Sequence, residues 1–177
     1  MVLKFRLISN EQDDFIRDIE ILDDQTFFHL HDSIQDNLHF DKSQIASFFI
    51  CNQKWEKEQE ITLFELSEED AAKVLVMDNT RIGDFMQATH DKMLYVFDVF
   101  SERLFFIELV EMMEQDSSKS YPRCSFEQGH PPQQVYMDDI FKPKADNLMD
   151  DDLFDGEDLD RFGFDQQIFD DSPPDEE

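Results

Sequence analysis

The sequence predicts an α+β fold with the element order β-β-α-β-α-β-β over residues 1–113, an extended arm over 114–136 and an acidic tail over 137–177. Three observations predict this organisation. Apolar residues alternate with polar ones at the N-terminus, which is the period of a half-buried strand. They then recur at helical spacing in the next segment. After Met113 both periods stop, and no repeat of solenoid length occurs.

Two strands open the chain. "VLKFRLIS" (residues 2–9) alternates apolar and basic residues, and "FIRDIEIL" (15–22) places Ile19 and Ile21 on one side. The turn-forming run "NEQDD" separates them, so we expect the two strands to pair as a hairpin.

A helix follows within "DDQTFFHLHDSIQDNLHF". Thr26 suits its N-cap, and the acidic pair at 23–24 suits the positive end of a helix. The apolar residues that fall on one helical face are Phe27, Leu30, Ile34 and Leu38.

The middle of the chain predicts one more strand and one more helix. "IASFFICN" (45–52) is short, apolar and aromatic, which is typical of a buried strand, and Trp55 follows it in a charged stretch. "SEEDAAKVLVM" (67–77) begins with the capping-box pattern of Ser67 and Asp70, which predicts a short helix. "RIGDFMQAT" is compatible both with a turn and with a second short helix.

The last two strands have the strongest patterns. "KMLYVFDVF" (92–100) and "RLFFIELVEM" (103–112) are rich in β-branched and aromatic residues, and "SE" between them suits a tight hairpin. Their nearly continuous apolar character predicts central strands that are covered on both faces.

The arm and the tail have no strand or helix period. Residues 114–136 contain turn formers and paired prolines, which favours an extended arm or linker. Residues 137–177 are acidic and of low complexity, with Gly156 and Gly163 among like charges. Such a composition predicts a disordered tail.

The charge limits the possible partners. The formal net charge is −28: residues 1–136 carry 12 bases and 27 acids, and residues 137–177 carry 3 bases and 16 acids. This field repels phosphates, so we expect no direct nucleic acid binding and a basic protein as partner.

Several sequence features predict a cytoplasmic protein. No apolar run reaches the length of a membrane span, and the N-terminus becomes charged too early for a signal peptide. Cys51 and Cys124 are far apart, which favours reduced thiols. The oligomeric state stays open.

The order of the motifs resembles a known family. "LKFRLIS" and "FIRDIEI" match two of its strands, the second written "IWRRIEV" in the family. "FFHLHDSIQDNLHF" matches a helix "LxxLHxxIQxxFGW" through Leu30, His31, Ile34 and Gln35. "LYVFDVFSERLFFIELVE" corresponds to "YxYDFGDxWxHxIxLE", and "YPRCSFEQGHPPQQ" to "PxCxxGxxACPPED". From Val2 to Gln134 the chain thus resembles the plasmid pRiA open-reading-frame-three-like family, also catalogued as transposon-passenger TnpR-like proteins.

The resemblance implies a roll-type α+β fold, in which helices back a mixed, mostly antiparallel sheet, and it implies no activity. This chain also departs from the motifs at their polar positions. The family's "HLHEF" reads "QIASF", its "GDxWxH" hairpin reads "FSERLFF", and its "CPPED" reads "HPPQQ". Loss of these imidazoles and carboxylates favours a binding protein over an enzyme.

The remaining candidate chemistry is sparse. His29 and His31 are two residues apart and point to opposite sides of a helix, whereas zinc pairs on helices use spacings of three or four. We therefore expect no metal site and no cofactor. For a metal-dependent or hydrolytic enzyme with a cleft site, the candidate catalytic residues are His31, Asp98, Cys124 and His130.

The tail contains apolar residues that no core explains. Acidic residues keep such a segment extended, while its apolar side chains remain able to dock beside basic residues. The sequence therefore predicts a non-enzymatic protein-binding module whose acidic aromatic tail docks on a basic surface; a DNA mimic is a further alternative. The predicted partner-binding residues are Phe141, Leu153, Phe154, Phe162, Phe164, Ile168 and Phe169.

Overall fold

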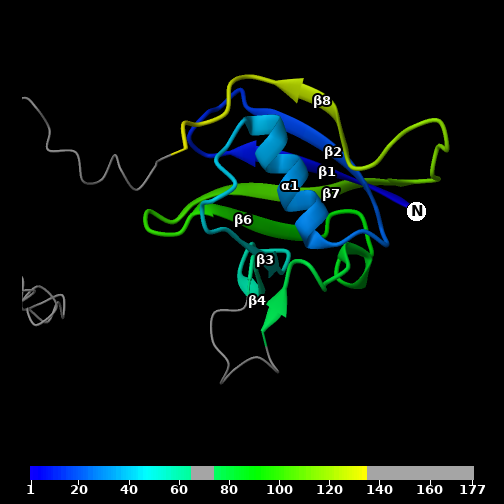
Figure 1. Cartoon of the computed structure of the whole chain (residues 1–177), viewed down its shortest axis with the longest axis horizontal. Coiled ribbons are helices and arrows are strands. Elements are labelled where there is room, and N and C mark those ends of the chain that lie inside the picture. The colour runs from blue at the N-terminus through cyan, green and yellow to red at the C-terminus, as the bar shows by residue number, and fades with distance from the viewer. Residues whose placement is uncertain (65–73, 135–177) are drawn as a thin grey trace, which may run out of the picture. The chain divides into compact units, whose positions relative to one another are not determined.

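The computed structural model describes residues 1–64 and 74–134 (Figure 1). They lie within one compact unit, Met1–Asp139, and the predicted tail lies outside the described residues. In chain order the elements are β1 (Val2–Ser9), β2 (Ile16–Leu22), α1 (Phe27–Leu38), β3 (Ser47–Cys51), β4 (Lys57–Thr62), β5 (Leu75–Val76), the 3₁₀ turn η1 (Ile82–Asp84), β6 (Lys92–Asp98), β7 (Arg103–Met113) and β8 (Arg123–Gln128).

The strands form one mixed sheet of eight strands in the order β5-β4-β3-β6-β7-β1-β2-β8. The β4–β5 pair is parallel, and every other neighbouring pair in this sheet is antiparallel. The broad α+β class and the mostly antiparallel sheet are therefore confirmed. In the described part a single α-helix backs the sheet, where the resemblance implied several.

Helix α1 begins where the sequence predicts. Thr26 is the N-cap, and its backbone N–H donates to His29 Nδ1 at 3.2 Å. Of the acidic pair before it, Asp23 Oδ1 lies 2.7 Å from the Met1 ammonium. The helix ends at His39, whose φ of 57° is left-handed.

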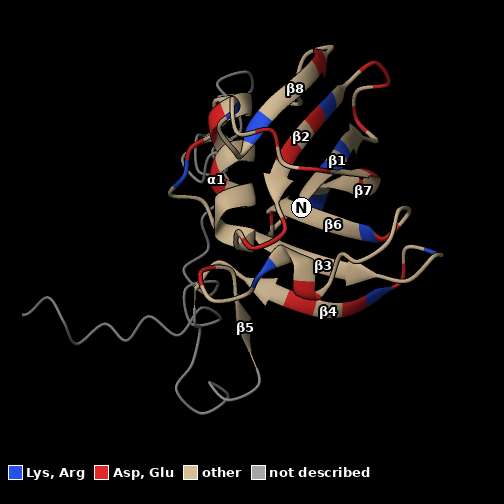
Figure 2. Ribbon diagram, turned by 90° about the vertical axis from the view of Figure 1, so that its right-hand side faces the viewer, with Lys and Arg blue, Asp and Glu red and all other residues tan. Residues whose placement is uncertain are grey.

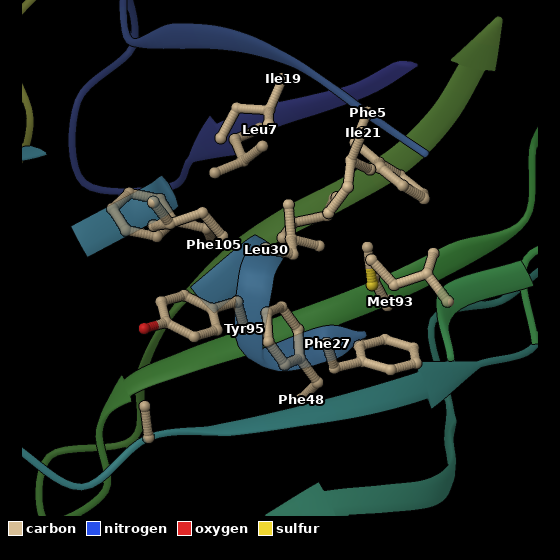
Figure 3. Close-up of a cluster of buried hydrophobic side chains, with 14 of the residues drawn as sticks. Phe5, Leu7, Ile19, Ile21, Phe27, Leu30, Phe48, Met93, Tyr95 and Phe105 are labelled. Carbon is tan, nitrogen blue, oxygen red and sulfur yellow. The ribbon is translucent and has the colours of Figure 1, made fainter. Parts of the chain in front are cut away.

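The hydrophobic core lies between α1 and one face of the sheet (Figure 3). Alternate residues of the central strands point to it, because side chains on a strand alternate between faces. Phe105, Ile107 and Leu109 of β7 are fully buried there. Leu30 and Phe27 of α1 close the core from the other side.

The two strongest predicted strands are central, as expected, since β6 and β7 are the fourth and fifth strands of the sheet. Coverage of both faces is correct for β6, where every residue after Lys92 is buried. It is wrong for β7: its residues that point away from α1, such as Phe106 and Glu108, are only half-buried. The second face of the sheet is therefore partly open.

Three segments differ from the predicted element order. Residues 67–77 were expected to form a helix, but Leu75–Val76 is the strand β5, and 65–73 lie outside the described residues. The charged stretch after Trp55 forms β4, whose residues Lys57–Glu60 are exposed and so show no apolar alternation. The predicted arm contains β8, which pairs with β2 as an edge strand.

Candidate functional sites

The two faces of the sheet are unlike, and each carries one candidate site. Figure 2 shows α1 on one side of the sheet only. On the helix side a buried histidine borders a hollow beside α1. On the other side, which we call the open face, aromatic and basic residues from β3, β4, β6 and β7 lie together.

His31, Gln35 and Tyr95 form a buried polar network on the helix side. His31 and Gln35 are four residues apart on α1, so both side chains project from the same face of the helix. Gln35 Nε2 donates to the Tyr95 hydroxyl oxygen at 2.6 Å, and that hydroxyl lies 2.7 Å from His31 Nδ1. Exposures of 0–2% place all three inside the fold.

Burial keeps this network neutral. Desolvation lowers the pKa of His31 from 6.5 to about 4, although Asp32 opposes the change. Desolvation also raises the pKa of the Tyr95 phenol, with the Gln35 hydrogen bond opposing it. At neutral pH the site therefore contains a neutral imidazole and a neutral phenol, which can exchange hydrogen bonds but carry no charge.

A hollow of about 360 Å³ lies next to His31, between α1 and the segment after β4. Its apolar lining includes Phe28 and Phe64, which are 37% and 47% exposed. Asp32 and Lys42 form a polar rim, and Lys42 Nζ is 2.5 Å from Asp32 Oδ1. Hydrogen bonds to Asp32 and Asp36 raise the pKa of Lys42, so the lysine is charged and neutralised within its own cluster.

The open face carries three aromatic rings, those of Phe49, Trp55 and Phe106. The rings of Trp55 and Phe106 meet edge to face with centroids 5.0 Å apart. Lys92 Nζ lies 4.9 Å from the Trp55 centroid, and Lys57 Nζ lies 4.2 Å from that of Phe49. Both distances allow cation–π contact.

A smaller hollow of about 230 Å³ is lined by Trp55 and Phe106. Ile8 and Val110 add apolar walls, while Arg6 and Glu108 add charges of opposite sign. Arg6 is held by a bidentate pair with Asp18 at 2.8 Å for both contacts, which raises the pKa of the guanidinium. The open face is therefore an apolar strip between paired charges.

The four candidate catalytic residues occupy separate places. Asp98 ends β6, and its Oδ1 accepts from the backbone N–H groups of Phe100 and Ser101, both at 3.1 Å. Cys124 lies in β8, where its Sγ donates to Phe126 O at 3.3 Å and burial raises the thiol pKa. His130 is exposed.

Among the described residues, no hydrogen bond or ion pair joins any two of these four. Only His31 of the four lies in the buried network. A raised pKa makes Cys124 a weaker nucleophile at neutral pH, since the thiolate is the reactive form. The predicted partner-binding residues all belong to the tail and lie outside the described residues.

Sequence reasoning found His31 and Gln35 through their motif but did not connect them with Tyr95. A tyrosine inside an apolar strand needs a hydrogen-bond partner for its hydroxyl, and this need is the signal that could have led to the network. Trp55 was noticed but given no role. Its left-handed backbone, with φ of 65°, turns the β3–β4 hairpin so that the indole reaches Phe106.

The described part shows neither a cluster of metal ligands nor a membrane-spanning helix. Within residues 1–64 and 74–134, no three His, Cys, Asp or Glu side chains gather as metal ligands would. No helix in the same residues combines the length and the apolar composition that a membrane span needs.

The sequence matches one protein family, and the fold is similar to a solved structure. The family described as plasmid pRiA4b ORF-3-like protein matches residues 1–171. Among solved structures, the fold is similar to the crystal structure of a protein of unknown function, MM3350, from Methanosarcina mazei Go1. The similarity has a TM-score of 0.57 at 17% identity and covers 71% of this chain and 68% of that one. None of the curated proteins compared with the sequence matches it.

Proposed function

The chain belongs to the plasmid pRiA4b ORF-3-like family, and we propose that it acts there as a non-enzymatic, cytoplasmic protein-binding module. Its acidic aromatic tail, residues 137–177, docks on a basic surface of a partner protein. The described residues form the domain that carries the tail. The two free cysteines, Cys51 and Cys124, suit a reducing compartment.

One observation carries this proposal: phenylalanines recur among the acids of the tail. Solubility accounts for the acidic residues and leaves the aromatic rings without a role. Burying such rings against a partner is favourable, and basic residues around the groove attract the acids. The tail phenylalanines are Phe141, Phe154, Phe162, Phe164 and Phe169.

The hydrogen bonds of the arm define where a tail truncation must begin. Arg103 donates to Gln133 O at 2.7 Å. The Gln134 side chain accepts from Asp41 N–H and donates to Asp41 O at 3.3 Å. A chain cut before Gln133 would lose these anchors, so a truncation that keeps residues 1–134 separates loss of the tail from damage to the domain.

The test compares three immobilised proteins: the full chain, residues 1–134, and a full chain with all five tail phenylalanines changed to alanine. The alanine variant keeps every charge. We expect one basic protein to be retained by the full chain and lost from both other proteins. Equal recovery of the partner by all three proteins would refute docking by the tail. Recovery by the alanine variant but not by residues 1–134 would mean that the charge of the tail alone attracts the partner.

The two alternatives give different results in simple assays. A metal-dependent enzyme would contain stoichiometric metal after purification, and its activity would depend on His31, the one candidate that lies in the buried network. A DNA mimic would displace DNA from a basic protein in proportion to its charge, and the alanine variant would do so equally well.

A further inference from the structure

We propose that the hollow beside His31 is a binding site for a neutral aromatic group that carries a carbonyl. His31 Nε2–H donates to the carbonyl oxygen, and Phe28 and Phe64 contact the ring. The site belongs to the folded domain and does not depend on docking by the tail.

The hydrogen bonds around Tyr95 determine which nitrogen of His31 carries the proton. The buried Tyr95 hydroxyl has two polar neighbours, the Gln35 amide nitrogen at 2.6 Å and His31 Nδ1 at 2.7 Å. The amide nitrogen can only donate, so the hydroxyl proton goes to Nδ1. A neutral imidazole that accepts at Nδ1 carries its hydrogen on Nε2.

This Nε2–H has no hydrogen-bond partner among the described residues, although His31 is only 2% exposed. Some side-chain atoms of this protein, such as Gln35 Oε1, are completely buried and have no hydrogen-bond partner. His31 Nε2 is not one of them, so this nitrogen keeps some exposed surface. His31 lines the hollow and is exposed by only 2%, and we infer that the exposed part of its ring, with Nε2–H, faces this space. Solvent can reach this donor, and a ligand acceptor in the hollow would take the place of that solvent.

The walls of the hollow select an apolar ring. Leu63, Phe28 and Phe64 line it, and Phe28 already lies 5.9 Å, centroid to centroid, from the His31 imidazole. Covering these two partly exposed phenylalanines with a ligand would remove apolar surface from water and so favour binding. The volume of about 360 Å³ is within the range of small-molecule sites.

The charges around the hollow favour a neutral ligand over an anion. Asp32 lies on the rim, and the Lys42 ammonium is already shared with Asp32 at 2.5 Å and Asp36 at 2.6 Å. A carboxylate would meet this acidic rim and the net charge of −28. An amide or ketone presents the same acceptor without that repulsion.

The probes are benzamide, benzoate and ethylbenzene, each titrated into the isotope-labelled full-length protein and followed by NMR. We expect benzamide to shift the His31 imidazole signals saturably. Ethylbenzene lacks the acceptor, and benzoate carries a charge, so each should bind at least roughly fivefold more weakly. The nitrogen spectrum of the free protein should show the Nε2–H tautomer.

Three variants test the assignment. His31→Asn keeps an acceptor for Tyr95 and removes the Nε2 donor, and Phe64→Ala removes an exposed wall that the fold does not need. Each should weaken benzamide binding roughly fivefold or more. Phe126→Ala, a matched exposed phenylalanine on β8 at 45% exposure, should bind benzamide normally.

The proposal is overturned if Phe64→Ala binds benzamide like the unmodified protein, even where His31→Asn does not fold. It is also overturned if the three probes bind equally, if no probe binds, or if His31 carries its proton on Nδ1. Tail truncation to 1–134 should leave benzamide binding unchanged, so failure of this site and failure of tail docking are distinguishable.

Discussion

At the scale of single residues, His31 is a titratable side chain that the fold removes almost completely from water. It is buried against Tyr95 and Phe28, and this burial disfavours the imidazolium. The groups that face it with charge are Asp32, which favours protonation, and Lys42, which opposes it. The stability of the fold therefore depends on pH through this one residue.

We expect acid to destabilise the protein through His31. The unfolded chain takes up a proton near pH 6.5, whereas the folded imidazole does so only at about 4. Between these values the unfolded state binds more protons, so the free energy of unfolding falls as pH falls. The loss from pH 7 to 4 should be about 3 kcal/mol larger than in His31→Asn, measured by urea unfolding at each pH. Carboxylates titrate in both proteins, and equal pH profiles would contradict the buried neutral imidazole.

Gly129 is a second residue whose environment permits little change. Its φ is +67°, and an added Cβ would lie 2.5 Å from the backbone oxygen of Asp14. Gly129→Ala should lower the free energy of unfolding by about 2 kcal/mol, because both the backbone conformation and the close contact exclude a side chain. The exposed neighbour His130→Ala is the control, and thermal unfolding measures both. A Gly129→Ala protein as stable as this control would show that the turn can adjust.

At the scale of elements, Arg17 joins three parts of the fold. It lies on β2 at 6% exposure, and its guanidinium donates to Asn37 Oδ1 of α1 at 2.9 Å. It also donates to Gln128 O at 2.6 Å and Gly129 O at 3.1 Å, at the end of β8. The same group lies 4.7 Å from the centroid of the Phe15 ring. The edge strand is thus tied to the helix through one side chain.

Arg17→Met should therefore be strongly destabilising. The methionine keeps much of the apolar stem but leaves carbonyl oxygens without donors, at a cost of about 3 kcal/mol in total. Lys119→Met is the control, since that lysine is exposed and, within the described part of the chain, its ammonium pairs with Asp116 alone, at 3.4 Å. Urea unfolding compares the two. Similar stabilities would mean that water replaces the guanidinium at β8.

At the scale of the whole molecule, the dominant property is charge. With 43 acids and 15 bases, the folded chain repels itself. Local ion pairs relieve part of this repulsion, as between Arg103 and Glu11 at 2.7 Å, which raises the pKa of that guanidinium. Most acids have no such base available, because acids outnumber bases almost threefold.

Salt should stabilise this protein. Raising NaCl from about 20 to 300 mM shortens the screening length and weakens repulsion between acids more than it weakens the few close pairs. We expect the Tm to rise by a few degrees in calorimetry. Equal ionic strengths of NaCl and KCl should act alike, because the screening length depends on ionic strength and not on which monovalent cation is present. A Tm that falls with salt would mean that the ion pairs outweigh the repulsion.

The sequence by itself determined the elements that have a strong local period. The strands with apolar alternation or near-continuous apolar runs, β1, β2, β3, β6 and β7, were predicted close to their observed bounds. So was helix α1 with its N-cap Thr26. Local periodicity decides these segments because each buries a regular face against the same core.

Tertiary structure alone decided the edges and the candidate sites. β4 and β8 lie toward the edges and present many exposed residues, so their pairing partners and not their own pattern make them strands. Tyr95 meets His31 across 64 residues of chain, and Trp55 meets Phe106 across the sheet. Such contacts depend on which strands become neighbours, and that choice rests on the packing of the whole core.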